Sequence, residues 1–419
     1  MSIRTLLRHP IPRRTVTITL LALFIGITVL VLPVVVLVTL PFALVPGAKA
    51  RPIRFGAFLV VYLVAEVVGL LSAVWLWLRL GVWIRENKDS VSGLSAGATS
   101  SLSSAADRNE LRRQRYQDAN YALLARMLTW LYAAGAKAFG LRVQVPEIIG
   151  RGDLETQEPV AAILGDEPLL VLSRHAGPGD SFLLVHALLV YARRRPLIVL
   201  KDTLAFDPLI DVALSRVPHC FITPRHALKQ QPGEADGQTG GRTGGQEPPA
   251  QPMPAGSTLM TLGTLSTPAQ EDMAASIGRM AAGMGPADAL LVFPEGANFT
   301  AGRRQRIIER LRHQGHSRAA LHAQRLRNVL PPHPNGVFAA IDAAPDASLV
   351  FVAHTGLDHM QSVADVWHGV PLDRPASVTW WTLPASRVPA QPQARLAWLQ
   401  ENWAQVDTWI SREQAALEP

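Results

Sequence analysis

A histidine and an aspartate stand five residues apart on a Gly-Pro turn, in the stretch LLVLSRHAGPGDSFLLVHALL at residues 169–189. The apolar run before His175 predicts a buried strand, and the apolar run after Asp180 predicts a helix. A histidine at a strand end can act as a general base, and an aspartate that folds back onto its Nδ1 fixes the tautomer. The competing interpretation is a surface histidine followed by a helix N-cap aspartate.

A second stretch, LLVFPEGANFT at residues 290–300, repeats the arrangement of a strand followed by a turn, with Glu295 at the strand end. Ligands of open α/β sheets bind beyond the carboxyl ends of the strands. Two chance turns would have to occur in one chain for both motifs to lack function. The two stretches together therefore favour a catalytic site.

The elements that must position these residues alternate along the chain. Short β-rich runs alternate with helical stretches such as 181–195 and 276–284, which predicts an α/β domain with a mainly parallel sheet flanked by helices. The predicted strands are residues 169–173, 197–201, 290–294 and 349–353.

Two apolar stretches precede this domain. Residues 15–48 contain no charged side chain, and residues 56–78 contain only Glu66. Each is long enough to span a bilayer, so we expect an N-terminal transmembrane helical hairpin or a re-entrant pair rather than two core helices. Basic residues flank both stretches, and the positive-inside rule then predicts a multi-pass membrane protein whose catalytic domain faces the cytoplasm.

Composition divides the chain into four regions. Residues 1–86 form the membrane hairpin, and residues 87–110, rich in Ser, Gly and Ala, are expected to be a flexible linker. Residues 111–388 are expected to form the α/β domain, interrupted by a Gly-, Pro- and Gln-rich insertion at 229–260 that is expected to be disordered. Residues 389–419 are expected to form a C-terminal amphipathic helix.

Two helices outside the sheet have amphipathic patterns. Residues 119–140 carry Trp130 and Tyr132, and this helix either lies on a membrane or packs on the domain. The C-terminal helix is expected to pack on the domain through Leu396, Leu399, Trp403, Val406 and Ile410.

The charge balance points to anionic partners. The net charge is +7, which suits an anionic lipid surface or a phosphorylated substrate. Nucleic acid is set aside because no basic stripe is interleaved with aromatic residues and no zinc-finger spacing occurs. The single cysteine, Cys220, cannot form an intramolecular disulfide.

The two motifs, in this order, resemble the blocks of the glycerolipid acyltransferase family, which includes the bacterial PlsC-like lysophosphatidate acyltransferases. His175 and Asp180 match its H-x₄-D block. Other family blocks are matched by Phe293, Pro294, Glu295 and Gly296 (F-P-E-G), by Phe221, Ile222 and Arg225 in HCFITPRHA, and by Lys201 and Pro208 in LKDTLAFDP. The continuation to Leu330, Pro331, Gly336 and Phe338 is similar to the lysocardiolipin acyltransferase-like branch.

This resemblance implies direct acyl transfer. His175 would deprotonate an acceptor hydroxyl, which attacks the thioester of acyl-CoA or acyl carrier protein, while Asp180 holds the imidazole. No cofactor, metal or covalent intermediate is implied, although a Cys220 acyl-enzyme remains a minor alternative. The expected substrate-binding residues are Lys201, Arg225, Glu295, Gly296, Asn298, Arg303 and Arg304.

The implied acceptor is 1-acyl-glycerol-3-phosphate, and the product is phosphatidate. Alternatives are another lipid acceptor (a lysocardiolipin-like lipid or a glycolipid), an inactive membrane lipid-binding protein, and a metal-dependent phosphohydrolase, which the scattered histidines disfavour. The other expected partners are membrane lipids.

One departure from the family bears on the acceptor. Ala297-Asn298 stands where the family has Thr-Arg, so a positive charge for a phosphate is missing. Either Arg303 and Arg304 reach back to replace it, which is the preferred reading, or the acceptor carries no free phosphomonoester.

Overall fold

The computed structural model describes residues 10–43, 49–81, 99–144, 166–177, 179–201, 206–217, 219–222, 268–358, 360 and 362–417. The insertion expected at 229–260 and the expected phosphate ligand Arg225 lie outside these ranges.

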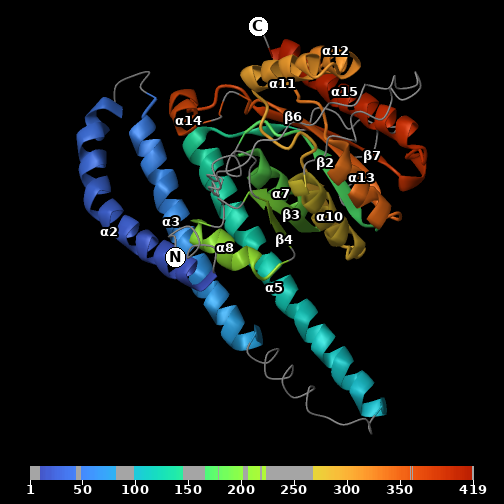
Figure 1. The fold of residues 1–419 in the computed structure, drawn as a ribbon. Coiled ribbons are helices and arrows are strands. Elements are labelled where there is room, and N and C mark those ends of the chain that lie inside the picture. The colour runs from blue at the N-terminus through green and yellow to red at the C-terminus, as the bar shows by residue number, and fades with distance from the viewer. Residues whose placement is uncertain are drawn as a thin grey trace, which may run out of the picture.

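A seven-stranded sheet forms the centre of the domain, in the order β1-β7-β6-β2-β5-β3-β4 (Figure 1). The strands are β1 Val143–Gln144, β2 Leu169–Ser173, β3 Arg195–Lys201, β4 His219–Ile222, β5 Asp288–Val292, β6 Ser348–Thr355 and β7 Ala376–Leu383. Strands β2 to β6 are parallel to one another, whereas β7 runs antiparallel to β6 and β1 runs parallel to β7. The predicted α/β fold with a mainly parallel sheet is confirmed.

Alternate side chains of the central strands enter two separate cores, because successive residues of a strand point to opposite faces. Leu170 and Leu172 of β2 pack with helices α10 (Pro268–Ala282), α13 (Pro334–Ala343) and α15 (Pro392–Leu417). Leu169 and Val171 pack with α5 (Thr99–Phe139) and α7 (Asp180–Val190) on the other face. The sheet is buried on both sides, which explains why its strands are continuous apolar runs.

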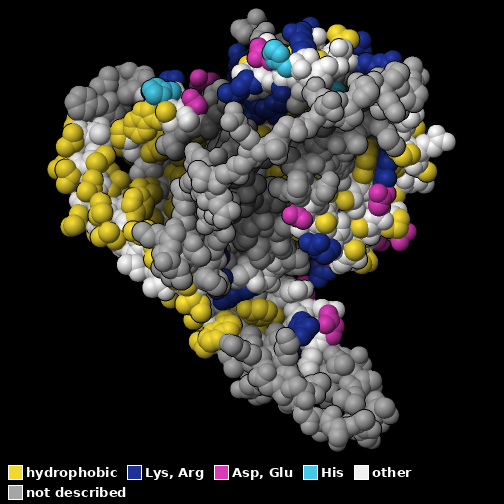
Figure 2. Space-filling model, in the orientation of Figure 1, with side chains coloured by type: hydrophobic (Ala, Val, Ile, Leu, Met, Phe, Trp, Pro, Cys, Tyr) yellow, Lys and Arg dark blue, Asp and Glu magenta, His cyan; other side chains and the backbone are white. Residues whose placement is uncertain are grey.

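The N-terminal hairpin consists of α2 (Pro10–Ala43) and α3 (Arg51–Leu76), the latter continued by the π-helical turn η1 (Trp77–Gly81). Both helices are long and apolar enough to span a membrane; none of the most apolar window of α2 is buried, against 28% for α3. Exposed apolar side chains accordingly gather on the hairpin in Figure 2.

The hairpin packs on the domain through α5 and the short helix α8 (Pro208–Leu214). Glu66, the one charge in the second apolar stretch, accepts the backbone N–H of Leu209 at 3.1 Å and is buried. At the base of the hairpin, Arg13 and Arg14 both bond the buried carboxylate of Asp211, at 2.6 and 3.0 Å. The carboxyl group of Glu66 therefore faces α8 of the domain.

Helix α5 corrects one expected boundary. It begins at Thr99, so residues 99–110 of the expected flexible linker are helical, while residues 87–98 lie outside the described ranges. From Thr99 onward the segment contains neither Gly nor Pro, and its Ala and Leu residues favour helix. Farther along, Leu123 and Met127 are buried against α3 and α8, so this helix packs on protein.

The C-terminal helix α15 packs on the domain. Leu399, Trp403, Val406 and Ile410 are fully buried in the core beside β6. The indole N–H of Trp403 also donates to the carbonyl of Leu330 at 3.0 Å. Helices α11 (Ala301–His313) and α12 (Ser317–Arg325) lie between β5 and β6, and α14 (Val363–Gly369) lies between β6 and β7. The short helix η3 (Ala385–Arg387) leads from β7 to α15.

We predict that Trp403→Ala destabilises the fold by about 3–5 kcal/mol, because it opens a cavity in the core and leaves the Leu330 carbonyl without its donor. The matched control is Trp130→Ala on α5, where the side chain is 39% exposed. Denaturant unfolding of both variants of the full chain measures the difference. Equal loss in the two variants would mean that α15 is not part of the core.

Candidate active site

The turn between β2 and α7 brings His175 and Asp180 together. His175 Nδ1 lies 3.1 Å from each carboxylate oxygen of Asp180. The same carboxylate accepts the backbone N–H groups of Ala176 at 2.6 Å, Gly177 at 3.0 Å and Ser181 at 2.7 Å. Asp180 therefore fixes both the imidazole and the backbone that carries it.

The charge state of this pair follows from its surroundings. Burial acts to raise the pKa of Asp180, but the hydrogen bond and charge of His175, with the charge of His354 and the N–H of Gly177, lower it to about 2. An ionised carboxylate only accepts, so Nδ1 of His175 carries a proton, and in the neutral form of the ring Nε2 is left to take one from a substrate. The ring also stacks on Phe293 with centroids 4.5 Å apart.

Glu295 lies beneath the turn that carries His175 and is almost inaccessible to water. Its side chain is buried, with Oε1 accepting the N–H of His175 at 3.0 Å and Oε2 accepting the N–H of Leu330 at 2.9 Å. Burial raises the pKa of Glu295 to about 8, against the lowering effects of the Arg174 charge and of these two N–H groups. The expectation that Glu295 contacts the acceptor stays a prediction; in the structure, both of its oxygens bond backbone N–H groups and connect the end of β5 to the His175 backbone.

Arg174, which the sequence analysis did not single out, is fully buried beside the histidine. Its guanidinium donates to the carbonyls of His354 at 2.8 Å and Asn328 at 3.0 Å, and it forms an ion pair with Asp358. Buried arginines require such partners. A basic side chain directly after an apolar strand was the available signal, but its partners lie more than 150 residues away in the chain and cannot be read from spacing.

The Pro-Glu-Gly motif forms a second turn against the first. The N–H of Phe299 donates to the carbonyl of His175 at 2.7 Å, which holds the two turns side by side. Gly296 has φ of +64°, and a Cβ there would approach His333 Cδ2 to 3.2 Å, so glycine suits this position. Asn298 occupies the turn, and its Oδ1 is buried without a hydrogen-bond partner.

The two arginines after this turn point to different places. Arg303 Nη1 donates to the carbonyl of Asn298, so its charge lies at the turn. Arg304 instead donates to the carbonyls of Leu326 and Gln324, the latter at 2.7 Å. The expectation that both arginines reach back is therefore met by Arg303 only, because α11 directs consecutive side chains to different sides.

Of the two remaining expected substrate-binding residues, Arg225 lies outside the described ranges and Lys201 is described only in part. Lys201 is the last residue of β3, at the same carboxyl edge of the sheet as His175, and only its backbone is described. Within the described ranges, no three His, Cys, Asp or Glu side chains are grouped so that they could hold a metal ion.

We predict that Glu295→Gln lowers kcat about tenfold to a hundredfold while the KM for the acceptor stays near the wild-type value. An amide has one acceptor oxygen, so the N–H of His175 or of Leu330 loses its partner and the histidine moves. Steady-state kinetics of the full chain in detergent measure both constants. A raised acceptor KM at unchanged kcat would show instead that Glu295 contacts the substrate.

The pH dependence of stability gives this prediction a second readout. The folded chain keeps the Glu295 proton up to about pH 8, whereas the unfolded chain releases it near the ordinary pKa of 4.5. The free energy of unfolding should therefore fall as pH rises from 4.5 to 8. Glu295→Gln should lack this part of the slope.

Comparison with known proteins agrees with this geometry. The family model described as Acyltransferase matches residues 151–354, a range that contains both catalytic turns. No curated protein and no solved structure matches the chain significantly. The chain therefore carries an acyltransferase domain of the glycerolipid acyltransferase family.

Proposed function

We propose that this protein is a membrane-bound enzyme that moves a fatty acyl group from acyl-CoA or acyl carrier protein to the free hydroxyl of a lysophospholipid. The preferred acceptor is 1-acyl-glycerol-3-phosphate, which would give phosphatidate. The observation that carries the proposal is the Asp180 carboxylate on His175 Nδ1, 3.1 Å away, beside the motif turn of an acyltransferase domain.

In the proposed reaction, Nε2 of His175 removes the proton of the acceptor hydroxyl. The oxygen then attacks the thioester carbonyl and forms a tetrahedral intermediate. As the carbonyl re-forms, the carbon–sulfur bond breaks and the thiolate takes the proton from the imidazolium, which Asp180 stabilises in the meantime. Atoms and charges balance without a metal or a cofactor.

The position of Cys220 argues against a covalent acyl-enzyme. Cys220 lies on β4 and pairs with Val199 of β3. Strands β5 and β3 separate β4 from β2, which carries the His175 turn. At about 4.8 Å per strand, the backbone of β4 lies roughly 14 Å from that of β2, so we do not propose Cys220 as the nucleophile.

Two features support an anionic acceptor. Arg303 brings its charge to the Asn298 carbonyl, and the N-terminus of α11, capped by Thr300, follows directly after the turn. Helix N-termini favour negative groups. A phosphate next to His175 would meet both, so Arg303 would replace the arginine that the family carries at Asn298.

A second acceptor class is supported by Asn298 itself. Its unpartnered Oδ1 can accept a hydrogen bond from a hydroxyl, which suits a phosphodiester or glycosylated lipid. We rank this class second because an uncharged glycosylated acceptor would leave the adjacent Arg303 guanidinium without an anion, and a phosphodiester would bring it less negative charge than a phosphomonoester.

The exposed apolar surface of α2 suits insertion into a bilayer, and only the outer side of α3 is free to join it, because α3 packs on α5 and α8. The basic ends of the hairpin would place the catalytic domain at the cytoplasmic surface. Lipid acceptor and lipid product would then enter and leave without crossing water.

We predict that His175→Ala lowers acyl transfer by about 10²–10⁴-fold, the usual cost of removing a general base, while the thermal unfolding midpoint stays within a few degrees of the wild-type value. Transfer of a radiolabelled acyl group to lysophosphatidate measures the rate. The control is His313→Ala, an exposed histidine on α11. Wild-type turnover by His175→Ala would contradict the proposed mechanism.

We also predict that Arg303→Gln raises the KM for lysophosphatidate about tenfold, because one charge-assisted contact is lost, and leaves the KM for monoacylglycerol, which lacks the phosphate, unchanged. Arg304→Gln is the matched control, since its guanidinium bonds backbone carbonyls away from the turn. Equal effects on both acceptors would favour the second acceptor class.

A further inference from the structure

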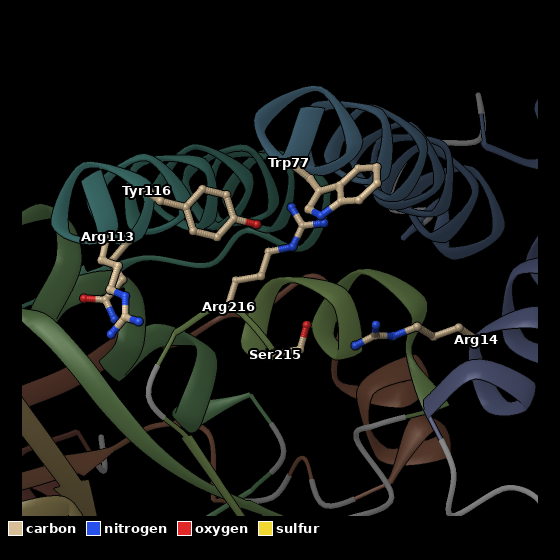
Figure 3. Close-up of a pocket in the computed structure, with 7 residues that line it drawn as sticks. Arg14, Trp77, Arg113, Tyr116, Ser215 and Arg216 are labelled. Atoms are coloured by element: carbon tan, nitrogen blue, oxygen red, sulfur yellow. The ribbon is translucent and has the colours of Figure 1, made fainter. Parts of the chain in front are cut away.

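A cavity of about 520 Å³ opens between the hairpin base and the domain (Figure 3). Four elements meet there, α2, η1, α5 and the end of α8. The cavity is lined by Arg14, Trp77, Arg113, Tyr116, Gln117, Ser215 and Arg216. Its size falls within the range of small-ligand sites.

The lining is strongly cationic. Three of its side chains are arginines, and no carboxylate belongs to the described residues that line it. The nearby carboxylate of Asp211 is shared between Arg14 and Arg13. Burial lowers the pKa of Arg216; the neighbouring Tyr116 acts to raise it, and the charge of Arg14 acts to lower it. These cations are crowded, and an anion between them would be stabilised.

The polar groups of the cavity are hydrogen-bond donors of the kind that bind phosphate oxygens. Guanidinium groups donate in the fork geometry that suits phosphate oxygens. In Figure 3 the hydroxyl of Tyr116 points towards the guanidinium of Arg216, and Arg14 reaches towards Ser215. The Ser215 hydroxyl donates to the carbonyl of Val212 at 2.8 Å, and one guanidinium nitrogen of Arg216 donates to the carbonyl of Ala73. The donors left for a ligand are the other N–H groups of the arginines and the hydroxyl of Tyr116.

The surroundings of the cavity point to a lipid as the source of that phosphate. Trp77 is 42% exposed and Trp75 is 54% exposed, at the end of α3. The guanidinium of Arg79 lies 4.9 Å from the centroid of the Trp75 ring. Tryptophan and arginine at the end of an apolar helix mark the depth of lipid headgroups.

This cavity lies near the amino ends of the parallel strands, whereas the catalytic turn lies at their carboxyl ends. His175 follows the carboxyl end of β2. Ser215 and Arg216 precede the amino end of β4, whose first residue, His219, pairs with Ile198 in the middle of the parallel strand β3. In parallel strands, the residues before one strand and the residues after its neighbour lie at opposite ends. A ligand in the cavity therefore does not occupy the acyl-transfer site.

We propose that this cavity binds the phosphate of an anionic phospholipid headgroup, as a site separate from the acyl-transfer centre. The arginines hold the phosphate, and the adjoining apolar surface of α2 and α3 receives the acyl chains. The bound lipid joins the base of the hairpin to α5 and α8, and so orients the domain on an anionic membrane.

The test is isothermal titration calorimetry of the full chain in a non-ionic detergent, which needs no acyl-transfer activity. The ligands are short-chain phosphatidylglycerol, short-chain phosphatidylcholine and soluble glycerol 3-phosphate. We expect one saturable phosphatidylglycerol site per chain. Its dissociation constant should be at least about tenfold lower than that of either other ligand, a difference of about 1.4 kcal/mol.

Two variants of α5 separate the site from general charge. Arg113→Gln removes a lining charge and should weaken phosphatidylglycerol binding about tenfold. Arg115→Gln also removes one positive charge, but two residues farther along α5 and outside the cavity lining. It should leave phosphatidylglycerol binding unchanged. Both side chains are exposed, so neither change should unfold the chain.

Three outcomes would overturn the proposal. They are phosphatidylcholine binding as tightly as phosphatidylglycerol, glycerol 3-phosphate binding as tightly as the lipid, and equal weakening by Arg113→Gln and Arg115→Gln. None of these outcomes affects the proposed acyl transfer, which is measured separately at His175.

Discussion

The active turn depends on one buried carboxylate. Asp180 is almost inaccessible to water, and a charge in that position is costly unless it is fully hydrogen-bonded. Its two oxygens accept from the His175 ring and from the N–H groups of Ala176, Gly177 and Ser181. These donors hold its pKa at about 2 despite burial. The same bonds that keep the charge also bend the chain back, so the geometry of the base and the stability of the turn have one cause.

The rest of the domain holds this turn from below. Glu295 joins its backbone to β5 and to Leu330, and Arg174 joins it to β6 and to Asn328. The backbone N–H of Asn328 in turn donates to Asp407 of α15 at 2.5 Å. Helix α15, far from the site in sequence, therefore helps to place the histidine. Acyl transfer by a general base requires such placement, because the base must meet a hydroxyl at hydrogen-bond distance.

The main strands of the sheet and the contact between His175 and Asp180 could be predicted from the sequence, because they follow from local residue patterns. Continuous apolar runs predicted strands β2, β3, β5 and β6, and the H-x₄-D spacing predicted the Asp180 contact. The roles of Glu295 and Arg174 could not be predicted, because their partners are set by how distant segments pack. Arg303 and Arg304 looked equivalent as neighbours in sequence, yet the helix directs them apart. Lys201 and Arg225 stay predictions.

The central claim is that Asp180 fixes His175 with the proton on Nδ1 and a bare Nε2, ready to deprotonate a lipid hydroxyl. The ¹⁵N chemical shifts of the His175 ring test this most directly, in the full chain labelled at histidine, with the resonances assigned by difference from His175→Gln. The account predicts a protonated Nδ1 and an unprotonated Nε2 at neutral pH, and loss of this preference in Asp180→Asn. A proton on Nε2 in the wild-type chain, with Nδ1 bare, would contradict it.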